Sequence, residues 1–372
     1  MPTPTGTYSW CMRRKTEDKS RLSSLSIAGV YIGAVIGAGF ASGQEIWRFF
    51  GLHGAGGFVG LALSGFLFAF FALAILCAGK LLQARSHLEV VNAIGGPMWG
   101  ALMDGFITIC LPVSLTVMLA GAGAGLAEQY GIPSFVGSTA MALATALTVL
   151  MGIQGVVVAI SLLAPLFVSL IMIVSVQAMR PGSVDWPWAM ASSMPRLSWL
   201  FSSLAYVTYN LILSASVLAP VGALAPTRAI IGGSLLGGLG LGLGAAAVNI
   251  AVLSQGPAVI SCDVPMLLVA EKMLPTVPWI FMVLLLIEIY TTAVAGLYGF
   301  AARLAPEDRG AFMRIVLVTT LFSLIAARVG FSRLVAVVYS AMGYVGAVFL
   351  AALTRWFWKT LRAGQWKEPP DM

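Results

Sequence analysis

The sequence predicts an all-α membrane protein with about ten transmembrane helices. Hydrophobic residues make up 59% of the 372 residues, only 9% are charged, and the mean hydropathy is +0.94. A soluble domain needs roughly 25% charged residues to cover its surface. Most of this surface must therefore face lipid, and only the segments 1–22 and 360–372 are polar enough to lie in water as tails.

Apolar segments divide the rest of the chain into helices. Each is near or above the roughly 20 residues that cross a hydrocarbon core about 30 Å thick. The stretch at about 255–276 is too short and too broken to span, so we expect a helical hairpin over the outer mouth. The expected helices are 24–50, 56–82, 98–127, 134–151, 154–179, 199–221, 229–254, 277–303, 311–329 and 333–358.

Basic residues orient these helices. If the N-terminus is cytoplasmic, most of the 21 Lys and Arg residues fall on the inner side, as cytoplasmic loops prefer. With ten helices the C-terminus returns to the same side, and we expect a multi-pass protein of the cell membrane. The same loop charges account for the net charge of +7, and because they are scattered near helix ends we expect no nucleic-acid partner.

An odd number of helices in each half predicts an inverted repeat. The halves would be 23–180 and 198–359, with a binding site between them near the membrane midplane. Both first helices read as interrupted. Helix 1 contains the glycine-rich run Gly37–Gly43, and helix 6 is polar from Tyr206 to Ser214 and closed by Pro220.

The glycine-rich run in helix 1 predicts a site for a solute or an ion. Backbone groups inside a membrane need partners, so an interruption is tolerated where a ligand or trapped water takes them up. The alternative is close helix packing, which Gly39-x-x-x-Gly43 also fits. Polar residues directly after the run favour the site, because such groups inside a span are costly and usually functional. They are Ser42, Gln44, Glu45 and Arg48.

Helix 8 carries a second polar group near its centre, Glu288 with Thr291 and Thr292. A buried carboxylate is usually protonated, paired or bound to a cation. The adjacent hydroxyls are hard oxygen ligands of the kind that suit Na⁺. Alternatively, both threonines bond back to the preceding turn of their own helix.

Three strings of this sequence resemble the YkvI-like family of bacterial membrane proteins, and the resemblance covers nearly the whole chain. They are Val30–Ile46, Tyr209–Pro220 and Glu288–Gly296. That family is similar to the wider amino acid–polyamine–organocation superfamily of secondary transporters with the LeuT-type fold. The resemblance implies a five-plus-five inverted repeat in which helices 1 and 6 are broken.

The resemblance also implies roles for individual residues. A sodium site would use the carbonyls of Gly33 and Ile36 and the hydroxyls of Thr291 and Thr292, with Glu288 nearby. Gln44 and Glu45 would gate or couple, and Arg48 is similar to the arginine that such transporters place outside the substrate. The solute would contact Gly37, Gly39, Phe40, Ala41, Ser42, Gly43, Tyr206, Tyr209, Asn210 and Ser214.

The function we expect is Na⁺-coupled transport of an amino acid or similar small organic solute by alternating access. Proton coupling is the alternative, since Glu45 or Glu288 could carry a proton, although helix 5 lacks the lysine found in some proton-coupled relatives. A channel or a solute sensor on the same fold is a further alternative. We expect no catalytic residues and no cofactor beyond the coupling ion, because His53 and His87 fall in expected loops and no metal-binding motif is present. The oligomeric state is open.

Overall fold

The computed structural model describes residues 22–84, 86–151, 169–179, 182–191, 194–305 and 308–363, and regular structure in these ranges is entirely helical. Eight helical stretches there are long and apolar enough to cross a membrane, which confirms the predicted all-α membrane fold. They are α4 (Ala55–Leu82), α5 (His87–Tyr130), α6 (Ser134–Met151), α9 (Ser198–Leu224), α10 (Thr227–Leu253), α12 (Val277–Leu304), α13 (Arg309–Ala326, extended by a 3₁₀ turn to Val329) and the stretch Phe331–Arg362. The last contains α14 (Phe331–Leu334), a π-helical turn (Val335–Tyr339) and α15 (Ser340–Arg362).

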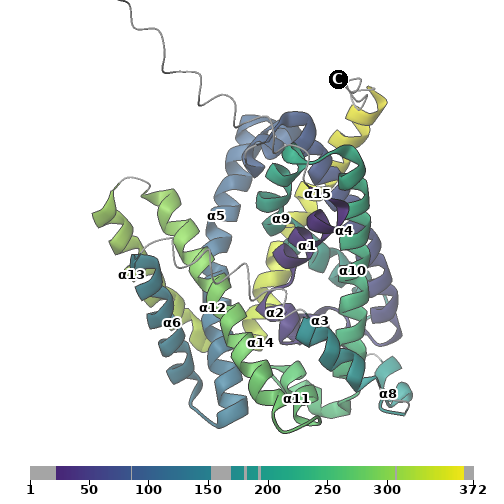
Figure 1. Cartoon of the computed structure of the whole chain (residues 1–372), viewed down its shortest axis with the longest axis vertical. Helices are drawn as coiled ribbons and strands as arrows, with labels where there is room; N and C mark the ends of the chain where they lie inside the picture. The colour runs from purple at the N-terminus through teal and green to yellow at the C-terminus, as the bar shows by residue number, and fades with distance from the viewer. Residues whose placement is uncertain are drawn as a thin grey trace, which may run out of the picture.

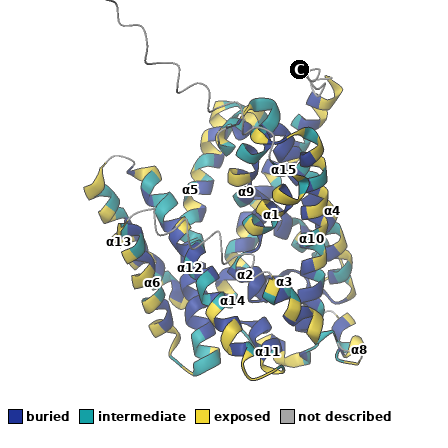
Figure 2. Cartoon of the chain, in the orientation of Figure 1, coloured by how far each residue is buried: buried dark blue, intermediate teal, exposed yellow. Residues whose placement is uncertain are grey.

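These helices pack as two groups (Figure 1). The first, which we call the bundle, contains α1 (Ser24–Val35), α4, α9 and α10, with α15 against α9. The second, the scaffold, contains α5, α6, α12 and α13. Exposed residues line α6 and α13 (Figure 2), and they include large apolar side chains such as Leu147 and Phe322, which are 60% and 75% exposed. A face of this kind suits contact with lipid.

Helix 1 is interrupted, as predicted. α1 ends at Val35, and Ile36 and Gly37 have extended backbone conformations. The chain then forms the short helix α2 (Ala38–Ala41) and turns at Gly43, whose φ of 78° favours glycine. It continues as α3 (Gln44–Phe49).

Helix 6, in contrast, is not broken, and this part of the predicted fold is corrected. α9 runs continuously from Ser198 to Leu224, with Pro220 accommodated inside it. The polar residues that suggested a break bond back to their own helix instead. Asn210 Nδ2 donates to the carbonyl of Tyr206 at 2.9 Å, and Ser214 Oγ donates to that of Asn210 at 2.7 Å. No glycine precedes Gly222 in α9, so the backbone lacks the freedom that helix 1 has.

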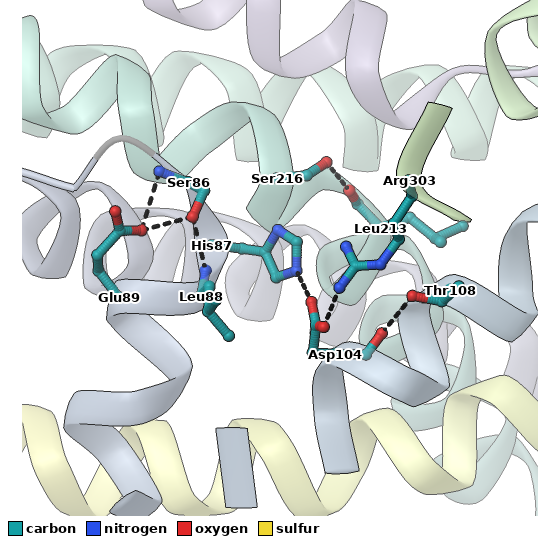
Figure 3. A network of polar contacts seen from close by, with 9 residues as sticks. All are labelled: Ser86, His87, Leu88, Glu89, Asp104, Thr108, Leu213, Ser216 and Arg303. Carbon is teal, nitrogen blue, oxygen red and sulfur yellow. Dashed lines mark hydrogen bonds and ion pairs between the residues drawn. The ribbon is translucent and has the colours of Figure 1, made fainter. Parts of the chain in front are cut away.

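Helix 3 begins earlier than predicted, and α5 includes a kink. Gly96 has a φ of 83°, which separates the segment 87–95 from the helix that follows Pro97. A polar network braces this start (Figure 3): Asp104 pairs with His87 at 3.5 Å and also with Arg303 at the end of α12. The network therefore ties the kinked start of α5 to α12.

Shorter helices complete the fold. Between α10 and α12 lie a 3₁₀ turn (Gly256–Ser261) and α11 (Pro265–Glu271), and α8 (Trp186–Met190) precedes α9. In Figure 1 α8 and α11 lie at the bottom, opposite the marked C-terminus. Of the predicted helix 154–179, the residues described as helical are Ser169–Ala178. The segment 152–168 and the tails 1–21 and 364–372 lie outside the described residues.

Backbones in the bundle approach so closely that side chains are excluded at several glycines, among them Gly79 and Gly222. A Cβ atom added at Gly222 of α9 would lie 2.0 Å from the carbonyl oxygen of Leu76 in α4, and one at Gly79 would lie 2.0 Å from that of Ala219. The opposing atoms are backbone and cannot move aside as a flexible side chain would. Small residues allow this close packing in membranes, where dispersion contacts hold helices together.

We expect Gly222→Ala to destabilise the protein by about 1–3 kcal/mol, because the helices must separate to admit the methyl group. Thermal unfolding of the purified protein in detergent measures this as a lower melting temperature. Gly29→Ala is the matched control, since nothing lies within 4 Å of an added Cβ there. Equal melting temperatures for the two variants would contradict the close contact between α4 and α9.

Candidate functional site

A cavity of about 240 Å³ lies at the interruption of helix 1. It is bounded by the bundle helices α1 and α9 and by the scaffold helices α5 and α12, and residues of α2, α3 and the π-helical turn complete it. The lining residues are Gly33, Ala34, Val35, Ile36, Gly37, Ala38, Gly39, Glu45, Ser114, Met118, Tyr209, Asn210, Leu213, Glu288, Thr291, Thr292, Ala295 and Tyr339. The site thus joins distant parts of the sequence, from Gly33 to Tyr339.

Two buried carboxylates line this cavity. Glu45 is 4% exposed, and its Oε2 accepts a hydrogen bond from the Tyr209 hydroxyl. Its Oε1 lies 1.8 Å from where a Cβ of Gly39 would be, so the glycine makes room for the carboxylate. Glu288 is 7% exposed, and its carboxylate has no hydrogen-bond or ion-pair partner among the described residues.

Aromatic rings form a stack beside Glu45. Tyr209 stacks on Phe49 at 5.8 Å between ring centroids and on Tyr339 at 4.8 Å. Tyr339 ends the π-helical turn Val335–Tyr339, and such turns occur often at functional sites. Sequence reasoning did not identify Tyr339, nor Ser114 and Met118 of α5, because each lies in an apolar run without a distinguishing motif.

The residues predicted to hold an ion all line the cavity. Gly33 and Ile36 lie at the carboxyl end of α1, where the last carbonyls of a helix lack partners within it. Thr291 Oγ1 donates to the carbonyl of Glu288 at 3.0 Å, which is the back-bonded arrangement that the alternative interpretation described. Its lone pairs, like those of the half-buried Thr292, are still available to a cation.

The residues predicted to contact the solute separate into two sets. Gly37, Gly39, Tyr209 and Asn210 line the cavity. The others lie outside the cavity lining: they are Phe40, Ala41, Ser42, Gly43, Tyr206 and Ser214. Tyr206 instead packs edge-on against neighbouring aromatic rings.

Ser214 has a supporting position behind the lining. Its hydroxyl lies 3.3 Å from the carbonyl oxygen of Ala34 at the end of α1 and 2.7 Å from that of Asn210. α9 thus meets part of the backbone that the interruption of helix 1 leaves without a helical partner.

The three predicted gating residues lie in three different environments. Glu45 lines the cavity itself. Gln44 Nε2 donates to Ser332 Oγ at 2.8 Å. Arg48 lines a separate pocket of about 400 Å³ that also contains His53. Arg48 is therefore not part of the solute cavity lining, and its gating role stays a prediction.

The loop that leads into α11 contacts the interrupted part of helix 1 at Ser42. We call residues 262–266 the lid. The N–H of Met266 donates to the carbonyl of Ser42 at 2.9 Å. The Glu128 carboxylate, at the end of α5, accepts from the N–H groups of Asp263 (2.5 Å) and Val264 (3.0 Å). Ser332 also donates to the Asp263 carboxylate. The lid thus connects helix 1, α5 and α14.

No protein-family model matches the chain. Among curated proteins it is similar to membrane protein YkvI of Bacillus subtilis (strain 168), with 28% identity over 344 residues, 90% of this chain and 96% of YkvI. It is also similar to YyaD of the same organism, with 26% identity over 328 residues, 87% of this chain and 93% of YyaD.

Solved structures share the fold at low sequence identity. MhsT in complex with L-phenylalanine matches with a TM-score of 0.65 and 18% identity, over 95% of this chain and 93% of MhsT. The inward-facing conformation of Mhp1 matches with a TM-score of 0.64 and 12% identity, over 94% of this chain and 79% of Mhp1. A Na⁺-coupled sialic acid symporter matches with a TM-score of 0.57 and 13% identity, over 92% and 82% of the two chains.

The sequence resemblance and the arrangement of helices thus agree across almost the whole chain. The chain is a homologue of membrane protein YkvI and has the fold of the LeuT-type transporters.

Proposed function

We propose that the chain is a secondary active transporter that moves an amino acid or similar small organic solute, coupled to Na⁺, by alternating access. The observation that carries this proposal is the interruption of helix 1, which opens onto a cavity between the bundle and the scaffold. At about 240 Å³ the cavity is smaller than the roughly 300–1,000 Å³ of pockets for drug-sized ligands, which suits a small solute.

The chemistry of one part of the lining supports a sodium ion. The carboxyl end of a helix attracts cations, and α1 ends at the cavity. Carbonyls of Gly33 and Ile36 and hydroxyls of Thr291 and Thr292 would supply oxygen ligands, which hard cations prefer. MhsT, which shares the fold, is described with bound L-phenylalanine, and the sialic acid symporter is described as Na⁺-coupled.

The positions of the lid and the cavity support alternating access. The lid closes the interruption at Ser42, whereas the cavity lining continues along α12 from Glu288 to Ala295, toward the end of that helix at Leu304. If both termini are cytoplasmic, as the basic residues predict, the end of α12 at Leu304 lies on the inner face of the membrane. The solute would then pass when the bundle rocks against the scaffold and the lid opens outward.

Proton coupling is the second candidate, and the two buried carboxylates favour it. Glu45 and Glu288 have no basic partner among the described residues, so either could gain and lose a proton during transport. Reconstituted protein separates the candidates: uptake of amino acids into liposomes should follow an imposed sodium gradient at constant pH. Uptake that follows a pH gradient and ignores sodium would favour the proton instead.

We expect the double substitution Thr291→Ala with Thr292→Ala to abolish sodium dependence while the protein still folds. Sodium at about 100 times its dissociation constant should stabilise the wild-type protein by about 2.7 kcal/mol. The double variant should show no difference in melting temperature between Na⁺ and K⁺ buffers. Thr139→Ala is the control, because this threonine lies on α6 outside the cavity and bonds back to Phe135. Unchanged sodium stabilisation in the double variant would exclude these residues from an ion site.

We expect Glu128→Ala to loosen the lid, because the N–H groups of Asp263 and Val264 lose their acceptor. These two hydrogen bonds are exposed and part-buried, so each contributes about 0.5–1.5 kcal/mol net, and amide hydrogen exchange in residues 262–266 should accelerate about tenfold. Glu271→Ala, at the exposed end of α11, is the control and should leave exchange unchanged. Equal exchange in both variants would show that Glu128 does not hold the lid.

A further inference from the structure

The charge of the cavity lining restricts what the cavity can hold. Glu45 and Glu288 both line it, and the lining contains no Lys, Arg or His among the described residues. The undescribed segment 152–168 contains no Lys, Arg or His either. Two carboxylates in a low-dielectric space repel each other, and each favours a neighbouring cation. The cavity is therefore built for positive charge.

An ion pair within the protein, the common reason for a buried carboxylate, does not account for either residue. Among the described residues the ion pairs are those of Asp104 with His87 and Arg303, away from the cavity. Glu288 is 7% exposed, lines the cavity and has no polar side-chain partner in the described chain. Glu45 has the neutral hydroxyl of Tyr209. Both carboxylates thus remain available to a cation, or to a proton, that enters the cavity.

The two carboxylates differ in what surrounds them. Glu288 lies on α12 within one turn of the hydroxyls of Thr291 and Thr292, which suits a metal ion. Glu45 lies beside the stacked rings of Tyr209 and Tyr339, and both rings belong to the lining. Tyr209 is stacked between Phe49 and Tyr339, so the aromatic face left for an organic ammonium group is that of Tyr339, a contact of about 0.5–2 kcal/mol. Glu45 is therefore the better partner for an amine.

We propose that the transported solute is a small organic amine with a net positive charge, and that Glu45 is the counter-ion of its ammonium group. This inference rests on the proposed transport function and narrows its substrate class. A sodium ion near Glu288 and an ammonium group near Glu45 would neutralise the lining. The free carboxylate of a zwitterion would find no basic side chain there, and an anion would add a third negative charge.

Ligands that share a side chain and differ in charge test this directly. The probes are a panel of L-amino acids, their C-terminal amides, which are cations, and their N-acetyl derivatives, which are anions. Dissociation constants for the purified full-length protein in sodium buffer are measured by thermal shift. We expect the best-binding amide to bind at least about tenfold more tightly than its parent acid, a difference of about 1.4 kcal/mol, and the N-acetyl derivative not to bind.

Substitution of Glu45 assigns the effect to one carboxylate. Glu45→Gln keeps the shape of the side chain, and we expect the amide and the parent acid to bind with similar constants in this variant. Glu271→Gln is the matched control on the exposed end of α11, and it should preserve the wild-type preference. If Glu45→Gln fails to fold, Tyr209→Phe replaces it as the test. This variant keeps the ring and removes the hydroxyl that contacts Glu45, and it should weaken amide binding.

The outcomes separate this inference from the proposed transport function. Parent acids that bind as tightly as their amides, or more tightly, would overturn the inference while transport of zwitterions stands. The same holds for an amide preference that survives Glu45→Gln in a folded protein. If no member of the panel binds or enters liposomes, both the cationic substrate and the proposed transport of amino-acid-like solutes are overturned.

Discussion

Backbone groups inside a membrane protein must find partners, because lipid offers none. The interruption of helix 1, from the end of α1 to the start of α3, leaves backbone groups without partners in their own helix. Three contacts meet part of this requirement: Ser214 bonds the carbonyl of Ala34, Ser42 Oγ bonds that of Gly39, and Met266 bonds that of Ser42. Two of the donors belong to other elements, α9 and α11. The interruption therefore links the lid and the bundle to the cavity by hydrogen bonds.

Close backbone packing holds the bundle together as a unit. In the bundle, the glycines Gly79 and Gly222 bring the backbones of α4 and α9 too close for a Cβ atom. Interfaces packed to this density have discrete arrangements and do not deform gradually. The boundary between bundle and scaffold instead contains the cavity. A change of conformation that moves the bundle as a unit would preserve the tight contacts and reshape the cavity.

The sequence was most informative where one residue type has one physical use. Glycines in helix 1 predicted the interruption, and the spacing of Glu288, Thr291 and Thr292 placed them together, because residues three and four apart share a helix face. The predicted break in helix 6 was wrong because polar side chains such as Asn210 and Ser214 can bond to their own helix as well as to a ligand. Tyr339 was missed because a π-helical turn has no sequence signature, and the gating role of Arg48 stays a prediction because spacing does not reveal which helices cover a face.

The correction to helix 6 also changes the electrostatics of the cavity. A broken helix 6 would have brought two further helix ends, and with them an amino end that attracts anions. The continuous α9 brings none, so the longest helix that ends at the cavity is α1, and its carboxyl end attracts cations. The amino ends of α2 and α3 oppose it, but with four and six residues these helices are too short for a comparable dipole. The carboxyl end of α1 and the side chains of Glu45 and Glu288 thus all favour positive charge in the cavity. The proposed preference for cations follows from the fold as well as from these two side chains.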